Sequence, residues 1–301
     1  MSDAAVAWSR KTRELHNHHM DSTVWNDFPF RDDDIIVGTY AKSGTTWVQQ
    51  IVAQLLFQGA DDVAVGHMSP WWDMRCVPSD VRAQVLGQTH RRVLKTHLPV
   101  DALVLSPKAK YIYIGRDGRD VVFSLHNHHS NHSQMAWQMI NDTPGRVGPP
   151  LPPADPDIRR YFRTWLEGDG YPYWSFWENI TSWWDARRLP NVRLVHFANL
   201  KKDMEGEIRA IADFLEVDVP EGNWPRIFEH CSFEWMRAHA DQVSPLGGMA
   251  WEGGGSTFIH KGTNGRWRDV LSQEESLRYE QLALERLGPE CAHWLQTGEM
   301  A

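Results

Sequence analysis

Residues 38–47 read GTYAKSGTTW, where a short apolar run leads through a glycine-containing turn into a segment of helical character. The first N–H groups of a helix lack backbone partners, and the helix dipole adds positive character at that end. Lys42 adds a full positive charge, and the hydroxyl groups of Ser43, Thr45 and Thr46 add hydrogen-bond donors. The segment therefore predicts a phosphate-binding site at the start of a helix.

The order of residues in this turn differs from the common nucleoside triphosphate loop. That loop follows the pattern G-x-x-x-x-G-K-[ST], with the lysine after the second glycine. Here Lys42 precedes Gly44. A small-molecule or nucleotide kinase built on a related turn stays open as an alternative, and it would use Mg²⁺ and transfer from ATP.

Three other segments have residue types suited to anionic ligands: KTHLP at 95–99, RDGRDVVFS at 116–124 and HKGTNGRWR at 260–268. Together with the turn, and in this order, they resemble the cytosolic sulfotransferase family. Members of that family transfer a sulfuryl group from 3'-phosphoadenosine 5'-phosphosulfate (PAPS) to a hydroxyl or an amine. The resemblance implies PAPS as donor, 3'-phosphoadenosine 5'-phosphate (PAP) as product, and no required metal.

The resemblance rests on four motifs between residues 34 and 268. The family's first motif is close to Y-P-K-S-G-T-T-W, and this chain has Ala41 in place of the proline. The K-T-H-L-P motif, which holds the family's catalytic histidine, is unchanged. Arg116 and Ser124 match the 3'-phosphate motif, and K-G-x-x-G-x-W occurs at 261–267.

The chemistry of sulfuryl transfer predicts roles for these residues. Negative charge develops on the leaving phosphate oxygen, so Lys42 and Lys95 are candidate cations for its stabilisation. The acceptor hydroxyl loses a proton, and the imidazole of His97 titrates near neutral pH, as a general base should. In the family the serine at position 124 contacts the catalytic lysine. The expected catalytic residues are His97, Lys42, Lys95 and Ser124.

The expected donor site combines phosphate and base binding. The turn would bind the 5'-phosphate. Arg116 and Ser124 would bind the 3'-phosphate through charge-assisted hydrogen bonds. Trp47 and Phe233 would contact the two faces of adenine. The expected nucleotide-binding residues are Lys42, Ser43, Gly44, Thr45, Thr46, Trp47, Arg116, Ser124, Phe197, Phe233, His260, Lys261 and Gly262.

Two of these positions depart from the family. Phe197 stands where relatives usually have a tyrosine, and His260 stands where they have an arginine. We therefore expect lower or pH-dependent nucleotide affinity. The segment after Trp267 also lacks the family's dimer motif, close to K-x-x-x-T-V-x-x-x-E, so its dimer is not carried over and the oligomeric state stays open.

Aromatic residues suggest an acceptor with an apolar body and one hydroxyl. Trp71 and Trp72 follow the expected cradle helix, and with His97 they are the candidate acceptor-binding residues. A phenol, a sterol, an aliphatic alcohol, an amine and a glycolipid headgroup all stay open.

Two histidine-rich tracts, at 16–20 and 126–132, invite a metal interpretation. Neither tract has a carboxylate or cysteine at ligand spacing, so no metal site is expected. We expect the first tract on the surface and the second at a helix end near the acceptor site.

The elements that must position these residues alternate along the chain. Apolar runs of strand length occur at 35–40, 92–96, 110–115 and 192–197, and helical periodicity follows most of them. This pattern predicts a single α/β domain, with a mostly parallel sheet flanked by helices and a phosphate-binding strand-loop-helix similar to that of P-loop nucleotide kinases. Ligands in such sheets bind at the carboxyl ends of the strands.

We expect one domain over residues 1–301, with flexible ends at about 1–25 and 297–301. The Pro- and Gly-rich segments 141–157 and 241–265 predict loops. Ser272 and Glu275 form a capping-box pattern that begins the last helix, and Gly288-Pro289 predicts its end.

Composition narrows the class of protein. The chain has 301 residues, 42% of them hydrophobic and 23% charged, with a formal net charge of −8, which disfavours nucleic-acid binding. The 3 cysteines are too few for a disulfide framework. No apolar run predicts a membrane span or a signal peptide, so we expect a cytoplasmic protein without stable membrane association. A non-catalytic nucleotide-binding homologue stays open beside the enzyme.

Overall fold

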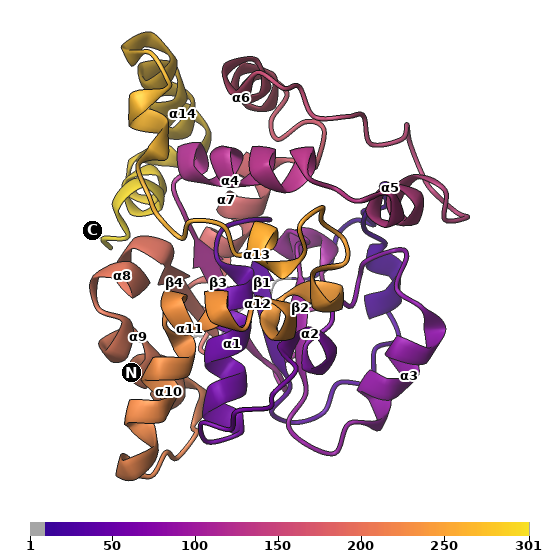
Figure 1. Cartoon of the computed structure of the whole chain (residues 1–301), viewed down its shortest axis with the longest axis vertical. Coiled ribbons are helices and arrows are strands. Elements are labelled where there is room, and N and C mark those ends of the chain that lie inside the picture. Colours follow the sequence, from indigo (N-terminus) through magenta and orange to yellow (C-terminus); the bar gives the residue numbers. More distant parts are fainter. Residues whose placement is uncertain (1–9, 301) are drawn as a thin grey trace.

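The computed structural model describes residues 10–300, and its centre is a four-stranded parallel sheet (Figure 1). The strand order is β2-β1-β3-β4, and all three neighbouring pairs are parallel. Their carboxyl ends therefore meet at one edge, with β1 between the strands that come next in sequence. The strands are β1 (Ile35–Thr39), β2 (Val93–Thr96), β3 (Lys110–Gly115) and β4 (Val192–His196).

The four predicted strands are confirmed to within one residue at each end. The only consequential difference is Phe197, which begins a helix instead of ending β4. The helix begins there because the His196 side chain accepts a hydrogen bond from the Ala198 N–H, as an N-cap does.

Helices cover both faces of the sheet. Ile36 and Leu94 point to one face, where the core includes side chains of α4, α6, α7 and α14. Val37 and Ile112 point to the other face, where α1, α9 and α10 pack. Because both faces are buried, the strands are continuous apolar runs. The longer helices are α1 (Thr45–Leu56), α3 (Ser79–Gly87), α4 (Gly118–Ser130), α5 (Gln134–Asn141), α6 (Ile158–Glu167), α7 (Phe176–Ala186), α9 (Met204–Leu215), α10 (Trp224–Cys231) and α14 (Gln273–Thr297).

Short helical pieces connect these elements. Where glycine content predicts a loop at 241–265, the structure has α12, η4 and α13 in succession, while 142–157 has no helix or strand. The short pieces are η1 (Ser22–Trp25), α2 (Val65–Met68), η2 (Val100–Ala102), α8 (Phe197–Lys202), η3 (Glu221–Asn223), α11 (Phe233–Ala238), α12 (Ala240–Val243), η4 (Pro245–Gly248), α13 (Gly255–Phe258) and η5 (Arg266–Asp269).

The histidine tract at 16–20 is not the surface stretch that its polarity predicts. His18 and His19 are buried, and Met20 and Trp25 are fully buried beside them. The polar rings are accommodated because His18 Nε2 bonds the carbonyl of Pro172 and the two imidazoles bond each other. The expected flexible ends fall partly on residues 1–9 and 301, which lie outside the described residues.

The last helix begins at the predicted capping box of Ser272 and Glu275. Gly288 leaves the helical conformation, with φ 74° and ψ 169°, so the first segment ends where predicted. A second helical segment then follows through Thr297, because Pro289 is compatible with the first turn of a helix. Within residues 10–300, no helix is both long and apolar enough to cross a bilayer.

Candidate active site

The turn after β1 presents a free helix N-terminus. Lys42 has φ 68° and Gly44, the N-cap of α1, has φ 120°. In the described part of the chain, the N–H groups of Gly44, Thr45 and Thr46 donate to no protein acceptor. These groups and the helix dipole can therefore bind an anion.

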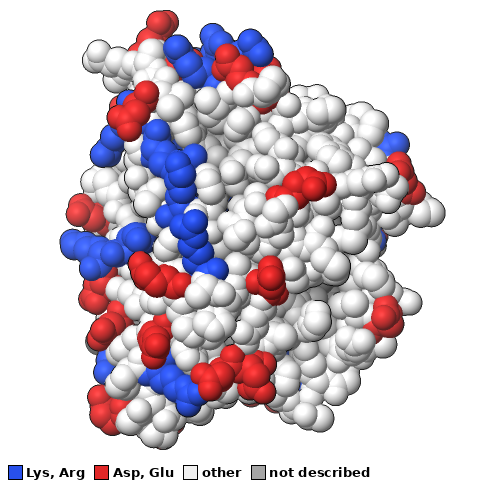
Figure 2. Space-filling model, in the orientation of Figure 1, with Lys and Arg blue, Asp and Glu red and all other residues white. Residues whose placement is uncertain are grey.

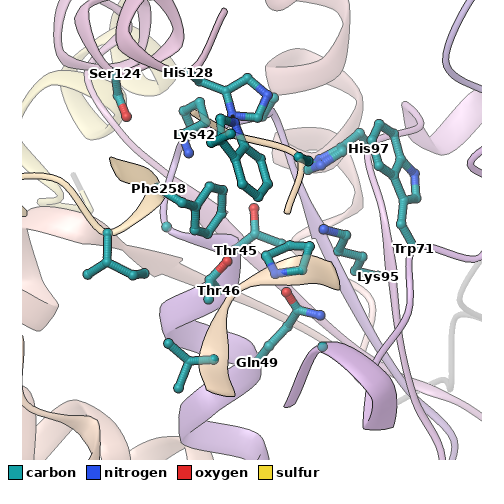
Figure 3. Close-up of a pocket in the computed structure, with 18 of the residues that line it drawn as sticks. Lys42, Thr45, Thr46, Gln49, Trp71, Lys95, His97, Ser124, His128 and Phe258 are labelled. Carbon is teal, nitrogen blue, oxygen red and sulfur yellow. Dashed lines mark hydrogen bonds between the residues drawn. The ribbon is translucent and has the colours of Figure 1, made fainter. Parts of the chain in front are cut away.

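A cavity of about 690 Å³ opens in front of this turn. It is lined by Lys42, Thr45 and Thr46 from the turn and by Lys95 and His97 from the end of β2. The predicted segments around 116–124 and 260–268 also reach it, through Arg116, Ser124, His260, Lys261 and Gly262. Figure 3 shows Lys42 and Ser124 on one side of the space and Lys95, His97 and Trp71 on the other.

Ser43 differs from its neighbours in the turn. Its side chain is fully buried and does not line the cavity, and its Oγ has no hydrogen-bond partner among the described residues. The sequence pattern alone could not separate it from Thr45 and Thr46, because orientation in a tight turn depends on each residue's backbone angles.

His97 is buried, and among the described residues only one of its ring nitrogens has a hydrogen-bond partner. Its Nδ1 lies 2.7 Å from the carbonyl oxygen of Thr39 on the adjacent strand. A carbonyl only accepts, so Nδ1 carries the proton and Nε2 keeps a lone pair. Burial, with the charge of Lys95, lowers the pKa of His97 to about 3. The ring is therefore neutral at pH 7 and can accept a proton. Its pKa lies well below the near-neutral value predicted from the sequence, because the ring is buried beside a cation.

The rings around His97 hold it in place. Trp71 meets it edge-on at 4.5 Å between centroids, and Trp174 stacks at 5.5 Å. The Asn179 amide donates to the His97 carbonyl at 2.9 Å. Trp71 thus lines the cavity, whereas Trp72, the other acceptor-binding candidate, packs into the core against Phe28.

Two lysines add positive charge to the cavity. The Nζ of Lys42 lies 3.9 Å from the centroid of the Phe258 ring. Burial, then Lys95 and Arg116, lower the pKa of Lys42 to about 7. Burial also lowers the pKa of Lys95 to about 8, against the opposing effect of Asp73. Both shifts reflect the cost of a buried cation, which an anionic ligand would offset.

Arg116, which follows β3, hydrogen-bonds both to the turn after β1 and to the segment at 263–264. Its Nη1 donates to the carbonyl of Lys42 at 3.2 Å, its Nη2 to the carbonyl of Thr263 at 2.8 Å, and its Nε to the Asn264 side chain at 3.0 Å. Its guanidinium also lies 4.0 Å from the Phe197 ring centroid. The sequence predicted a phosphate ligand, and the structure adds this bridging role.

The other predicted nucleotide-binding residues also line the cavity. Trp47 Nε1 donates to the Cys231 carbonyl at 2.8 Å, its ring centroid lies 5.3 Å from that of Phe197, and Phe233 also lines the cavity. His260 has a buried Nδ1 without a partner among the described residues, and burial, with Arg266 and Lys261, lowers its pKa. Figure 2 shows a band of Lys and Arg on the face of the molecule drawn there, although the chain has a net negative charge.

Asp73 is a buried carboxylate that the sequence analysis missed. It accepts hydrogen bonds from Trp25 Nε1 at 2.8 Å and Trp71 Nε1 at 2.5 Å. Burial raises its pKa to about 6. Asp73 positions the indole of Trp71, which contacts His97. In the sequence, only its place directly after the Trp71-Trp72 pair pointed to Asp73.

The structure also brings His19, His128 and His132 to the cavity. The tract at 126–132 lies at the end of α4, so the predicted helix end is confirmed, and its place near the acceptor stays a prediction. Over residues 10–300, no group of three or more potential side-chain ligands has the geometry to hold a metal ion.

Comparison with known proteins gives the family. The model of the sulfotransferase domain matches residues 32–288. The chain is 29% identical to a glycolipid sulfotransferase of Mycobacterium bovis, covering 92% of each chain, and 28% identical to sulfotransferase 1A1 of Rattus norvegicus, covering 82% of each.

Solved structures show the same fold. The mouse sulfotransferase SULT7A1 complexed with PAP has a TM-score of 0.70 at 21% identity, covering 91% of this chain and 92% of that one. A retinol dehydratase in complex with androsterone and PAP has a TM-score of 0.66 at 22% identity, with coverage of 88% and 83%. The predicted α/β fold is confirmed.

Proposed function

This chain belongs to the sulfotransferase domain family and is an enzyme of that family, and from that premise we propose that it transfers a sulfuryl group from PAPS to a hydroxyl of a small, largely apolar phenol or alcohol. The observation that carries the proposal is the shared cavity. The free Nε2 of the neutral His97, the Lys42 ammonium and the open N-terminus of α1 all face one space.

The residues of the cavity fit the donor. Among the described residues, the N–H groups of Gly44, Thr45 and Thr46 have no acceptor and suit a 5'-phosphate, with Lys42 beside them. The Ser43 N–H already donates to the Tyr40 carbonyl, so in this proposal Ser43 shapes the turn. When bound, PAPS supplies the sulfuryl group and a phosphate oxygen as the leaving atom. In the proposal, Arg116, Ser124, His260, Lys261 and Gly262 bind the 3'-phosphate, and Trp47, Phe197 and Phe233 enclose the adenine.

In this mechanism one residue accepts the proton of the acceptor hydroxyl, and other residues stabilise the negative charge on the leaving phosphate. His97 accepts the hydroxyl proton at Nε2, while its Nδ1–H stays on the Thr39 carbonyl and preserves the ring orientation. Lys42 stabilises the negative charge that develops on the leaving phosphate, and Lys95 adds to the field from the next strand. Ser124, which lines the same cavity from α4, contacts Lys42 in this proposal.

Apolar and aromatic side chains around His97 support an acceptor with an apolar body. The relative from Mycobacterium bovis is named a glycolipid sulfotransferase, which supports an acceptor hydroxyl on a lipid-like molecule. The free thiols of Cys76, Cys231 and Cys291 support a reducing, cytoplasmic location in this proposal.

The test is His97→Ala in a PAPS transfer assay over a panel of phenols and alcohols. We expect the rate of transfer to fall by about 10²–10⁴, as for loss of a general base, while PAP binding by calorimetry is retained. His16→Ala, an exposed histidine outside the cavity, serves as the control.

Transfer by His97→Ala at the wild-type rate, with chemistry limiting, would contradict the base assignment. Transfer from ATP and Mg²⁺ but not from PAPS would favour the kinase instead. Tight PAP binding without transfer to any acceptor would favour a non-catalytic homologue.

A further inference from the structure

An arc of aromatic rings runs from the proposed base to the proposed cation. Successive members, including three histidines on α4 and its C-terminal extension, are in ring contact, and the arc ends 3.9 Å from Lys42 Nζ. The centroid distances are His97–Trp71 4.5 Å, Trp71–His19 5.9 Å, His19–Tyr173 5.4 Å, Tyr173–His129 5.4 Å, His129–His132 5.6 Å, His132–His128 4.8 Å, His128–Trp251 5.2 Å and Trp251–Phe258 4.3 Å.

His128 has a defined tautomer. The indole N–H of Trp251 donates to His128 Nδ1 at 3.1 Å, and an indole nitrogen can only donate. The neutral ring of His128 therefore carries its proton on Nε2, which has no protein partner among the described residues. His128 lines the cavity and is seen between Lys42 and His97 in Figure 3. It offers one hydrogen-bond donor.

His19 has the opposite tautomer. His18 Nε2 lies 2.8 Å from the Pro172 carbonyl, so it carries the proton and His18 Nδ1 accepts. Its partner at 2.5 Å is His19 Nδ1, which must therefore donate. His19, only 4% exposed and lining the cavity, keeps an acceptor lone pair on Nε2.

Three polar atoms in or beside this arc also lack partners among the described residues. They are His132 Nδ1, Tyr173 Oη and Trp174 Nε1, all buried and without a hydrogen bond in the described part of the chain. All three residues line the cavity, and His132 and Trp174 are each 7% exposed. Because all three atoms are themselves buried, they do not reach a ligand in the cavity, and the subsite rests on the Nε2 atoms of His19 and His128.

We propose that this arc is a hydroxyl-binding subsite and that the acceptor carries at least one further hydroxyl adjacent to the reacting one. In this proposal His128 Nε2–H donates a hydrogen bond to the oxygen of that hydroxyl, and the hydroxyl donates a hydrogen bond to His19 Nε2. The acceptor is then a vicinal diol or polyol rather than a simple alcohol or phenol. The inference rests on the proposed function and narrows its acceptor class.

A neutral polyol suits this wall better than an ionic group. Burial lowers the pKa values of His19 and His128 well below the usual range, so the rings are uncharged at pH 7. Neutral imidazoles each provide one donor and one acceptor, which complements a hydroxyl group. A carboxylate would need donors only and would meet the lone pair of His19.

The test compares octane-1,2-diol with octan-1-ol, which have the same chain length and differ by one hydroxyl. The wild-type enzyme should favour the diol in kcat/KM by on the order of tenfold or more, since a buried donor left unpaired is costly. His128→Phe should lower that preference by on the order of tenfold. The matched control is His126→Phe on the same helix, which lies outside the cavity and should keep the wild-type ratio.

An unchanged diol preference in His128→Phe, or no preference in the wild type, would overturn the subsite. If His128→Phe does not fold, His19→Phe removes the proposed hydrogen-bond acceptor of the same hydroxyl and should likewise lower the diol preference. Calorimetric binding of both compounds to the PAP complex separates the two hypotheses. Absence of transfer to both compounds contradicts the proposed function. Tighter binding of the diol than of octan-1-ol, lost in His128→Phe, would still support the subsite. Equal binding of the two compounds to the wild type would overturn it.

Discussion

Lys42 is a partly buried cation whose protonation depends on an anionic partner. Burial and two neighbouring cations lower its pKa to about 7. Above that pH the free protein holds Lys42 largely neutral, whereas a bound phosphate favours the ammonium form. Binding of PAP at pH 8 should therefore take up a proton, and PAP affinity should fall as the pH rises above 7.

Calorimetry at pH 8 in buffers of different ionisation enthalpy measures this uptake. Lys42→Met should remove about one proton from it. The exposed Lys108, paired with Asp32 on the surface, provides Lys108→Met as the control. Equal proton uptake by Lys42→Met and the wild type would show that another group titrates.

At the scale of elements, the start of α1 determines whether the phosphate cradle can form. Gly44 has φ 120°, and a Cβ there would lie 2.8 Å from Ile114 Cδ1 and 3.0 Å from Phe197 Cδ2. Gly44→Ala should therefore both strain the turn and displace the Phe197 ring. We expect a loss of stability of about 1–3 kcal/mol together with weaker PAP binding.

Gly59, at the other end of the same helix, provides the control. It has φ 82°, but a Cβ there would meet only the Arg226 side chain, at 3.5 Å. Gly59→Ala should lower the free energy of unfolding and leave the Kd for PAP unchanged. The role assigned to Gly44 is wrong if both variants bind PAP equally well.

At the scale of the whole molecule, buried histidines should make the fold sensitive to acid. Burial lowers their pKa values below 6.5, so below that pH the unfolded chain binds protons that the folded chain does not, and stability falls as the pH falls. Asp73 and Asp120, with pKa values raised to about 6, offset part of this effect. The histidines with pKa values lowered to about 3 or 4 are His97, His129, His132 and His196.

Denaturant unfolding between pH 7.5 and 5 measures this dependence. The free energy of unfolding should decline below pH 6.5, and replacing one buried histidine, as in His129→Gln, should reduce the slope by about 1.4 kcal/mol per pH unit. The exposed His16 provides His16→Gln as a control that keeps the wild-type slope. A flat profile between pH 6.5 and 5 would contradict the prediction.

The sequence by itself determined the sheet and the residues at its carboxyl edge. Strand and helix periods are local properties, so β1 to β4 and the start of α1 were predicted to within about a residue. Parallel strands bring their carboxyl ends together, so Lys42, His97 and Arg116 were expected at one edge, and they line one cavity.

Only the tertiary structure decided which neighbouring side chains point into the cavity. Ser43 and Trp72 turn away from it while Thr45 and Trp71 face it, because packing and not residue type determines direction. The tautomers of His19, His97 and His128 depend on partners at Pro172, Thr39 and Trp251, which are remote in sequence. Hydrogen-bond partners brought together by folding thus determine which ring nitrogens donate and which accept.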